Sequence, residues 1–132
     1  MKKAREVMTK HVIATKPHAM ARHALVQILI GQYSGMPVIN EQSEVVGVVS
    51  EFDLVKAIHK NMSLDKTPIE EIMTKNPHTV DVSEPLESII NIMIEKGYLR
   101  IPVIENGKLV GVISRSDILR SYYDSEPVRT IY

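Results

Sequence analysis

A serine and an aspartate three residues apart occur twice in this chain, each time within the same phrase. The phrase reads GVVSEFDL from Gly47 to Leu54 and GVISRSDI from Gly111 to Ile118. The apolar run before each serine predicts a strand, and the residues after it predict a helix. A hydroxyl and a carboxylate therefore meet where a strand turns into a helix, and there they can cap the helix or bind a polar ligand.

The two roles make different demands on the same side chains. In a capping box, Ser50 and Ser114 would bond the helix backbone while Asp53 and Asp117 reach back to the serine N–H. Glu or Gln usually serves as the acid in such a box, and the glycine three residues before each serine leaves space beside the strand. Both points favour a ligand site. The helix N-terminus and the serine would then donate to a phosphate, and the carboxylate would accept from both hydroxyls of a ribose. One pair can perform both roles.

The two phrases belong to a longer internal repeat. EVMTK at 6–10 recurs as EIMTK at 71–75, and MPVI at 36–39 recurs as IPVI at 101–104, so the numbering of both pairs is offset by 71 − 6 = 65. The glycine phrases are offset by 111 − 47 = 64, and the missing residue falls in a polar turn, where changes of length are tolerated. Ordered matches with one gap in a loop indicate a duplication.

Each repeat predicts the same order of elements, β-α-β-β-α. A short β-prone stretch leads into an amphipathic helix, whose pattern runs to Gly31 in the first copy and ends just before Gly97 in the second, where Ser83 is the expected N-cap. Two apolar runs follow, separated in the second copy by Asn106-Gly107, a strong hairpin signal. The expected strands are 12–15, 36–39 and 45–49 in the first copy and 78–82 in the second. The helical patterns cover 20–31 and 86–93, and the second helix of each copy is expected at about 52–60 and about 117–123.

These elements divide the chain into a first motif at 1–60, a linker at 61–67, a second motif at 68–124 and a C-terminal tail at 125–132. The sequence Thr67-Pro68-Ile69-Glu70 predicts a short helix capped by its threonine. One repeat of about 55 residues is too small to be stable alone, so the two are expected to pack on each other.

Composition excludes several classes of function. The chain has 132 residues, is 44% hydrophobic and balances 16 basic against 16 acidic residues, so no excess of positive charge favours nucleic acid. There is no run of 18 apolar residues for a membrane span, no apolar segment behind the N-terminal lysines for a signal peptide, and no cysteine. A cytoplasmic protein that binds neither nucleic acid nor membrane is expected.

With these motifs in the same order twice, residues 4–123 resemble a tandem cystathionine-β-synthase (CBS) domain pair, or Bateman module. The resemblance implies an α/β (α+β) fold of two pseudo-symmetric β-α-β-β-α motifs, packed through their sheets into one module with two clefts. It also implies binding of an adenosine-containing ligand, namely AMP, ADP, ATP or an S-adenosylmethionine-type compound. Such modules are not enzymes. They commonly form homodimers and regulate a partner, which in this case would be a separate, unidentified protein.

The resemblance also assigns roles to residues. The strand that opens each repeat would contact adenine, the residue before Pro-Val would line the base pocket, and the residue before that would offer a basic group to phosphate. The expected first cleft contains Ile13, Ala14, Met36, Ser50 and Asp53. The expected second cleft contains Thr79, Val80, Arg100, Ile101, Ser114, Arg115 and Asp117.

The two copies differ in charge at two of these positions. Gly35 and Glu51 in the first copy correspond to Arg100 and Arg115 in the second. If both arginines reach the second cleft, a phosphate there meets two cations as well as a helix N-terminus. This difference predicts that the second cleft binds phosphate more tightly, and that the first is empty or takes an uncharged or cationic adenosine compound.

A structural or oligomerisation module with vestigial clefts is the alternative function, because Ala14 and Gly35 lack side chains that could bind a ligand. An enzyme is disfavoured, since no catalytic residues, metal ligands or glycine-rich cofactor loop are recognisable. His18 and His23 are five residues apart, which does not place two metal ligands on one helical face. No catalytic cofactor is expected. A homodimer is also expected because the apolar helix faces exceed what one neighbouring repeat can cover.

Overall fold

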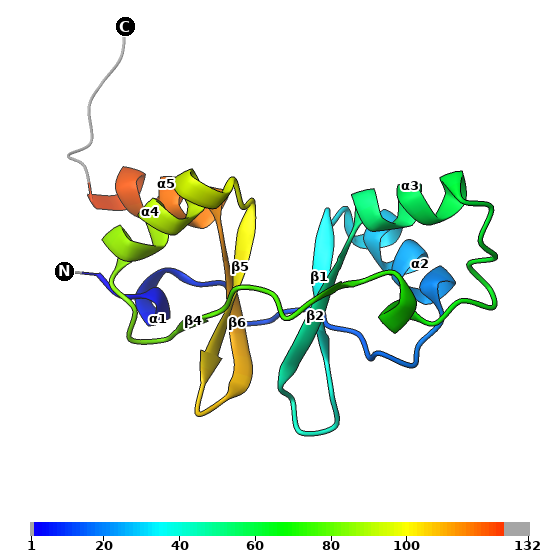
Figure 1. Cartoon of the computed structure of the whole chain (residues 1–132). Helices are drawn as coiled ribbons and strands as arrows, with labels where there is room; N and C mark the ends of the chain where they lie inside the picture. The colour runs from blue at the N-terminus through cyan, green and yellow to red at the C-terminus, as the bar shows by residue number, and fades with distance from the viewer. Residues whose placement is uncertain (1, 126–132) are drawn as a thin grey trace, which may run out of the picture. The chain divides into compact units, whose positions relative to one another are not determined.

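The computed structural model describes residues 2–125 (Figure 1). Within them two β-α-β-β-α-like motifs are confirmed, except that the predicted opening strand of the first repeat, at 12–15, forms only a single bridge, from Thr15 to Val38. The predicted C-terminal tail lies outside the described residues except for Ser125. The elements are α1 (Ala4–Val7), α2 (Ala21–Gly31), β1 (Gly35–Ile39), β2 (Val45–Ser50), α3 (Glu51–His59), the 3-10 helix η1 (Ile69–Glu71), β3 (Thr74–Lys75), β4 (Val80–Asp81), α4 (Leu86–Lys96), β5 (Arg100–Glu105), β6 (Lys108–Ser114) and α5 (Arg115–Ser125).

The chain forms two compact units, which we name after the aspartate that each contains. The Asp53 unit holds residues 12–78 and 106–109, and the Asp117 unit holds residues 2–11, 79–105 and 110–125 of the described chain. We call EVMTK at 6–10 and EIMTK at 71–75 the Met-Thr segments of the two repeats. Each unit contains most of one repeat together with the Met-Thr segment of the other. The division into motifs at 1–60 and 68–124 follows the sequence repeat and stays a prediction. The compact units differ from these motifs because the Met-Thr segment of each repeat packs in the unit that holds most of the other repeat.

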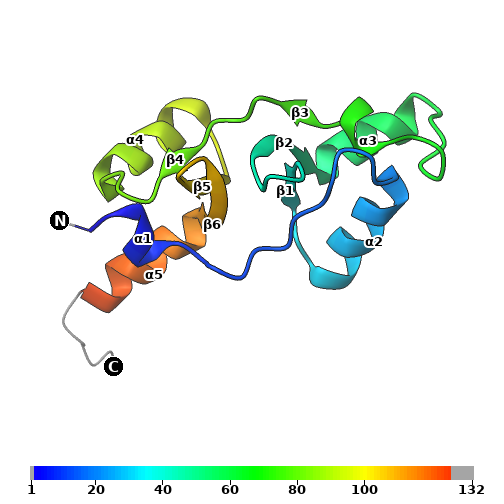
Figure 2. The same cartoon turned by 90° about the horizontal axis from the view of Figure 1, so that it is seen from below.

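The Asp53 unit contains the three-stranded sheet β1-β2-β3, in which β2 pairs antiparallel with both neighbours. The opening stretch of the repeat contributes one parallel bridge, from Thr15 to Val38 of β1. Helices α2 and α3 bury their apolar faces on this sheet (Figure 2). The core residues are Ala21, Ala24, Ile28, Met36, Val38, Val49, Leu54 and Ile69.

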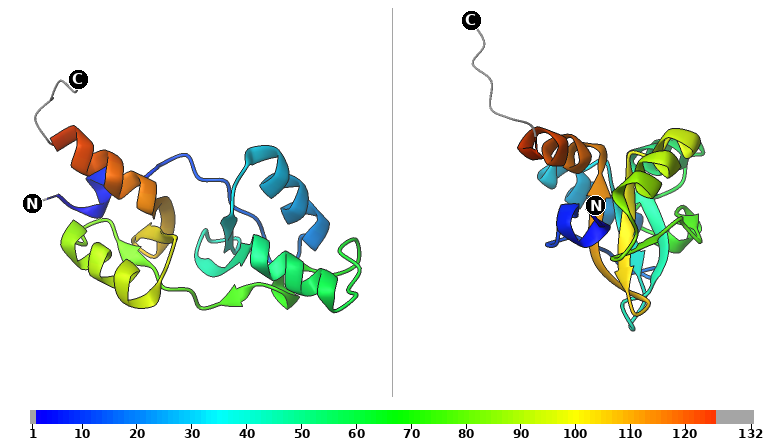
Figure 3. Two further views of the ribbon diagram at one scale, coloured as in Figure 1. Left: turned by 90° about the horizontal axis from the view of Figure 1, so that it is seen from above. Right: turned by 90° about the vertical axis from the view of Figure 1, so that its left-hand side faces the viewer.

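The Asp117 unit contains the sheet β4-β5-β6, and Thr9 extends it by an antiparallel bridge to Val112 of β6. Ile89 and Met93 of α4 are buried on this sheet, and α5 packs against it through Ile118 (Figure 3). The short helix α1 lies beside α5, and Ala4 of α1 is fully buried in the same core. Segments from the two ends of the described chain thus complete one hydrophobic core.

Close packing explains why each repeated phrase contains a glycine before its serine. A Cβ on Gly111 would lie 2.6 Å from Sδ of Met8 and 2.9 Å from the carbonyl oxygen of Thr9. Gly47 has the same relation to Met73 and Thr74 in the other unit. The space beside each glycine is therefore filled by a Met-Thr segment, so the interpretation that the glycine admits a ligand there was wrong.

Several helix ends differ from the predicted ones. Helix α2 runs through Gly31, and Gln32 adopts the left-handed conformation (φ 56°) that Gly97 (φ 69°) adopts after α4. The N-cap of α4 is Pro85, because the Ser83 hydroxyl donates to Asp81 instead (2.6 Å). Before η1, Thr67 donates its hydroxyl to the Ser63 carbonyl (2.6 Å) and caps no helix. Within residues 2–125, no helix is long and apolar enough to cross a membrane.

Candidate functional site

In the Asp53 unit, the Ser-Asp pair forms a closed set of hydrogen bonds at the start of α3. The Ser50 N–H and hydroxyl both donate to Oδ2 of Asp53, at 2.9 and 3.0 Å, and the Asp53 N–H donates to Ser50 Oγ at 3.2 Å. Asp53 is only 5% exposed. Its second oxygen, Oδ1, lies 3.6 Å from Nζ of Lys56, one helical turn further along α3.

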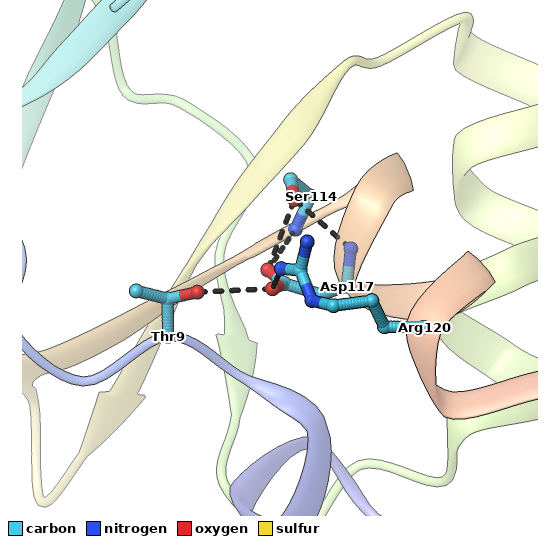
Figure 4. Close-up of polar contacts among 4 residues, drawn as sticks. All are labelled: Thr9, Ser114, Asp117 and Arg120. Carbon is cyan, nitrogen blue, oxygen red and sulfur yellow. Dashed lines mark hydrogen bonds and ion pairs between the residues drawn. The ribbon is translucent and has the colours of Figure 1, made fainter. Parts of the chain in front are cut away.

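The Asp117 unit repeats this geometry at the start of α5. The Ser114 N–H and hydroxyl donate to Oδ2 of Asp117 at 2.8 and 3.0 Å, and the Asp117 N–H donates to Ser114 Oγ at 3.2 Å. Here Oδ1 accepts two further bonds, from the Thr9 hydroxyl at 2.9 Å and from Nη2 of Arg120 at 2.5 Å (Figure 4). The Asp117 carboxylate is thus bonded on both oxygens.

Both pairs are capping boxes, and aspartate serves as the acid although Glu or Gln is usual in this role. It reaches the serine N–H because that serine has extended backbone (Ser50 φ −121°, ψ 167°), which turns its N–H back toward the helix. The cap engages only one carboxylate oxygen. The other oxygen of each aspartate is the atom through which a ligand hydroxyl could bind.

The opening strands align one residue away from the predicted pairing. Thr15 bridges Val38, and Val80 pairs with Val103, so Thr15 is the counterpart of Val80 and Ala14 is the counterpart of Thr79. Thr15 and Val80 are buried, each 4% exposed. Ala14 and Thr79, one residue earlier, are half-buried, and Ile13 is 39% exposed.

Asp81 is the last residue of β4 in the Asp117 unit, and its side chain is exposed. The hydroxyl and the backbone N–H of Ser83 donate to its carboxylate, which lowers the pKa of Asp81 below its usual value. The carboxylate is therefore charged at neutral pH, at the end of the strand expected to contact adenine.

Met36 and Ile101, expected in the base pockets, are members of the hydrophobic cores and are 2% and 0% exposed. Arg100 is partly buried at the start of β5. Arg115 is exposed, and its guanidinium donates to the carbonyl oxygens of Tyr98 (3.0 Å) and Gly97 (3.2 Å), at the end of α4. The structure thus directs Arg115 to the negative end of a helix, which weakens the charge argument for phosphate at the second site.

Three residues of these sites escaped the sequence analysis: Thr9, Lys56 and Arg120. A signal for each was present. Thr9 belongs to the repeated EVMTK segment, and Lys56 and Arg120 occupy equivalent positions, each one helical turn after its aspartate and offset by 120 − 56 = 64. Thr9 lies close to Asp117 because the Met-Thr segments are exchanged between the repeats. Lys56 and Arg120 lie close to their aspartates because each is one helical turn further along α3 or α5. Among residues 2–125 there is no cluster of three or more potential metal ligands.

Two β-α-β-β-α repeats, each with Ser-x-x-Asp at the junction of a strand and a helix, define a pair of CBS domains. The family model of the CBS domain matches residues 4–60 and 69–124, and the chain belongs to this family.

Similar proteins occur in several organisms. An uncharacterized 17.7 kDa protein of Acidianus ambivalens is 32% identical over 92% of this chain and 74% of its own length. An uncharacterized protein of Methanocaldococcus jannaschii is 26% identical, and the match spans 88% of this chain but only 41% of that protein. The chloroplastic CBS domain-containing protein CBSX1 of Arabidopsis thaliana is 30% identical over 88% of this chain and 62% of its own length.

Solved structures share the fold over nearly the whole chain. CBSX2 of Arabidopsis thaliana, solved in complex with AMP, has a TM-score of 0.84 and 26% identity, covering 94% of this chain and 98% of that one. A CBS domain pair solved with 5'-methylthioadenosine and S-adenosyl-L-methionine has a TM-score of 0.82 and 24% identity, covering 96% of this chain and 99% of that one.

Proposed function

We propose that this protein is a non-catalytic regulatory module that binds an adenosine-containing ligand at its Ser-x-x-Asp sites and signals to a separate partner protein. The observation that carries the proposal is the assembled geometry at both helix N-termini. Each buried aspartate is fixed by its serine through Oδ2 and directs Oδ1 to a position where only exposed side chains compete for it. The AMP complex of the similar protein CBSX2 supports adenosine as the ligand class.

The proposed roles follow from the chemistry of each group. Ribose hydroxyls would donate to the Asp53 or Asp117 carboxylate, which accepts hydrogen bonds and donates none. Serine hydroxyls and the positive end of the helix dipole would favour a phosphate, although the first N–H of each helix already donates to a carbonyl, Glu51 to Ser34 and Arg115 to Leu99. The proposed ligand-binding residues are Ile13, Ala14, Met36, Ser50 and Asp53 at the first site, and Thr79, Val80, Arg100, Ile101, Ser114, Arg115 and Asp117 at the second.

Isothermal titration calorimetry tests the proposal. AMP, ADP, ATP and S-adenosylmethionine would be titrated into the wild-type chain and into the double variant Asp53→Asn/Asp117→Asn. We expect saturable heat from at least one ligand with the wild type and none with the double variant, whose folding is checked by circular dichroism. If millimolar concentrations of all four ligands produce neither heat nor a shift in melting temperature, the proposal is overturned.

A structural module is the second candidate, and one observation favours it. Both carboxylates already serve as helix caps, and two of the expected base-pocket residues, Met36 and Ile101, are fully used in the cores. Such a module would bind its partner equally well with and without nucleotide. Mass spectrometry of small molecules released from the purified, denatured protein discriminates the two candidates, because only a ligand-binding module would release a stoichiometric adenosine compound.

We also propose that the protein forms a homodimer through its helices. Both units leave large apolar side chains of their helices exposed, among them Leu29 and Ile30 of α2 (68% and 80%) and Ile94 and Leu119 of α4 and α5 (76% and 68%). A groove of about 360 Å³ runs between α4 and α5, lined mainly by apolar residues such as Ile90 and Met93. Exposed apolar surface of this extent is typical of protein interfaces.

A further inference from the structure

The two aspartate sites have the same serine bonds but differ at Oδ1. At Asp117 this oxygen accepts from Thr9 (2.9 Å) and Arg120 (2.5 Å), whereas at Asp53 the neighbouring cation, Lys56, is 3.6 Å away. Thr74 is the counterpart of Thr9, at 9 + 65 = 74, and within residues 2–125 its hydroxyl makes no hydrogen bond to Asp53. Oδ1 of Asp117 therefore accepts two hydrogen bonds, whereas Oδ1 of Asp53 accepts none from the side chains of residues 2–125.

Backbone placement does not cause this difference. Thr9 exchanges backbone hydrogen bonds with Val112 (2.8 and 3.0 Å), and Thr74 is paired with Val48 in the same way along β3. The carbonyl oxygens of both threonines also lie equally close, 2.9 Å, to the Cβ position of the glycine beneath them. The difference lies in the side chains.

The basic side chains differ in reach and in competing contacts. The Arg120 guanidinium is a planar fork that can direct one N–H at the carboxylate from three residues along the helix. The Lys56 ammonium lies 5.0 Å from the ring centre of Phe52, so it is shared between the aromatic face and Asp53. The position of Phe52 is occupied by Ser116 in the second copy, which offers no ring.

We infer that the hydrogen bonds from Thr9 and Arg120 to Oδ1 of Asp117 block the second site. The first site, at Asp53, therefore binds the adenosine ligand more tightly than the second. Asp53 is the site that accepts a ribose diol in the resting protein, and Asp117 accepts one only when the Thr9 hydroxyl and the Arg120 guanidinium give up Oδ1. Both donors belong to exposed residues, so a ligand can displace them without unfolding either helix. This inference rests on the proposed function and reverses the order that the charges alone predicted.

The experiment measures AMP binding at each site alone and then again after the threonine hydroxyl near that site has been removed. AMP is titrated calorimetrically into Asp117→Asn, which leaves the first site, and into Asp53→Asn, which leaves the second. We expect the first site to bind more tightly. Adding Thr9→Val to the Asp53→Asn chain removes one competing hydrogen bond to a charged group, which should raise the affinity of the second site about tenfold. Thr74→Val in the Asp117→Asn chain is the matched control and should leave the affinity of the first site unchanged.

An exchange of the basic residues gives a second test that keeps the Thr9 packing intact. Arg120→Lys should raise the affinity of the second site, and Lys56→Arg should lower that of the first. Tighter AMP binding by Asp53→Asn than by Asp117→Asn would overturn the inference, as would an unchanged or weaker second site after both Thr9→Val and Arg120→Lys. Equal affinities at two working sites would overturn the inference alone, whereas no AMP binding by the wild type would overturn the proposed function together with it.

Discussion

Gly47 lies directly beneath the Met73 side chain, so that a Cβ on the glycine would be 2.5 Å from the methionine sulfur. The same relation, at 2.6 Å, joins Gly111 to Met8. The two most clearly repeated segments of the sequence, EVMTK/EIMTK and the glycine phrase, are thus repeated because each copy of one packs on a copy of the other.

Gly47→Ala should therefore destabilise the protein by about 1–3 kcal/mol, the range for overpacking a well-packed site. The methionine can move, but the Thr74 carbonyl oxygen, 2.9 Å from the new Cβ, belongs to a paired strand and cannot move without loss of β2–β3 pairing. Urea unfolding followed by circular dichroism measures the change. The double variant Gly47→Ala/Met73→Ala should recover only part of the loss, and full stability of the single variant would contradict the packing role.

Gln32→Gly should stabilise the protein by about 1 kcal/mol, because a left-handed residue at the end of a helix is best occupied by glycine. Gln32 adopts φ 56° after α2, a conformation that costs a side-chain-bearing residue free energy and costs glycine none. The second copy provides the matched control, because Gly97 has φ 69° and, in the described part of the chain, nothing lies within 4 Å of its Cβ position. Gly97→Gln should therefore lower the free energy of unfolding by a similar amount, for backbone reasons alone. Urea unfolding should show a gain in stability for Gln32→Gly and a loss for Gly97→Gln.

Thr15→Val should also stabilise the protein, by about 1–2 kcal/mol, the scale of the desolvation cost of an unsatisfied buried polar group. The Thr15 hydroxyl is buried and has no hydrogen-bond partner among residues 2–125, and valine occupies the equivalent position, Val80, in the second copy. Replacing this hydroxyl by a methyl group of the same shape removes that cost. Thr67→Val is the control: Thr67 is also buried but donates to the Ser63 carbonyl, so its loss should destabilise. A loss of stability in Thr15→Val, measured by urea unfolding, would show that the hydroxyl has a partner in solution.

The repeat, the β-α-β-β-α order and the hairpin at Asn106-Gly107 were predictable because each depends on local periodicity or local turn chemistry. Asn106 and Gly107 both have positive φ, as a two-residue type I′ turn requires. Each Ser-x-x-Asp pair was also predictable as a unit, since its two residues are one helical turn apart. Its bonding as a true capping box was underestimated.

One contact that distinguishes the two sites, the hydrogen bond from Thr9 to Asp117, was not predictable from local pattern. Thr9 and Asp117 are 108 residues apart in the chain, and their bond depends on the exchange of Met-Thr segments between the repeats. The hydrogen bonds of Arg115 were not predictable for a related reason. Sequence shows its charge but not the carbonyl oxygens of Tyr98 and Gly97 at the end of α4, to which its guanidinium donates.

The last prediction concerns association. Leu29 and Ile94 are equivalent in the two copies (29 + 65 = 94), and both are exposed, by 68% and 76%, on helices that present apolar side chains outward. We expect the wild-type protein to scatter light as a particle of twice its 14.9 kDa mass at micromolar concentration. Leu29→Glu or Ile94→Glu should shift it toward the monomer, because each places a charge in the apolar contact, where its burial is costly.

Glu95→Lys provides the control for this prediction, since Glu95 is exposed on the same helix as Ile94 but is already polar. It should leave the mass unchanged, and circular dichroism should show that all variants remain folded. A wild-type particle with the mass of a single chain at these concentrations would contradict the dimer. If only one of the two glutamate variants dissociates, the interface involves the helices of one unit, because the two substitutions report on α2 of the Asp53 unit and α4 of the Asp117 unit separately.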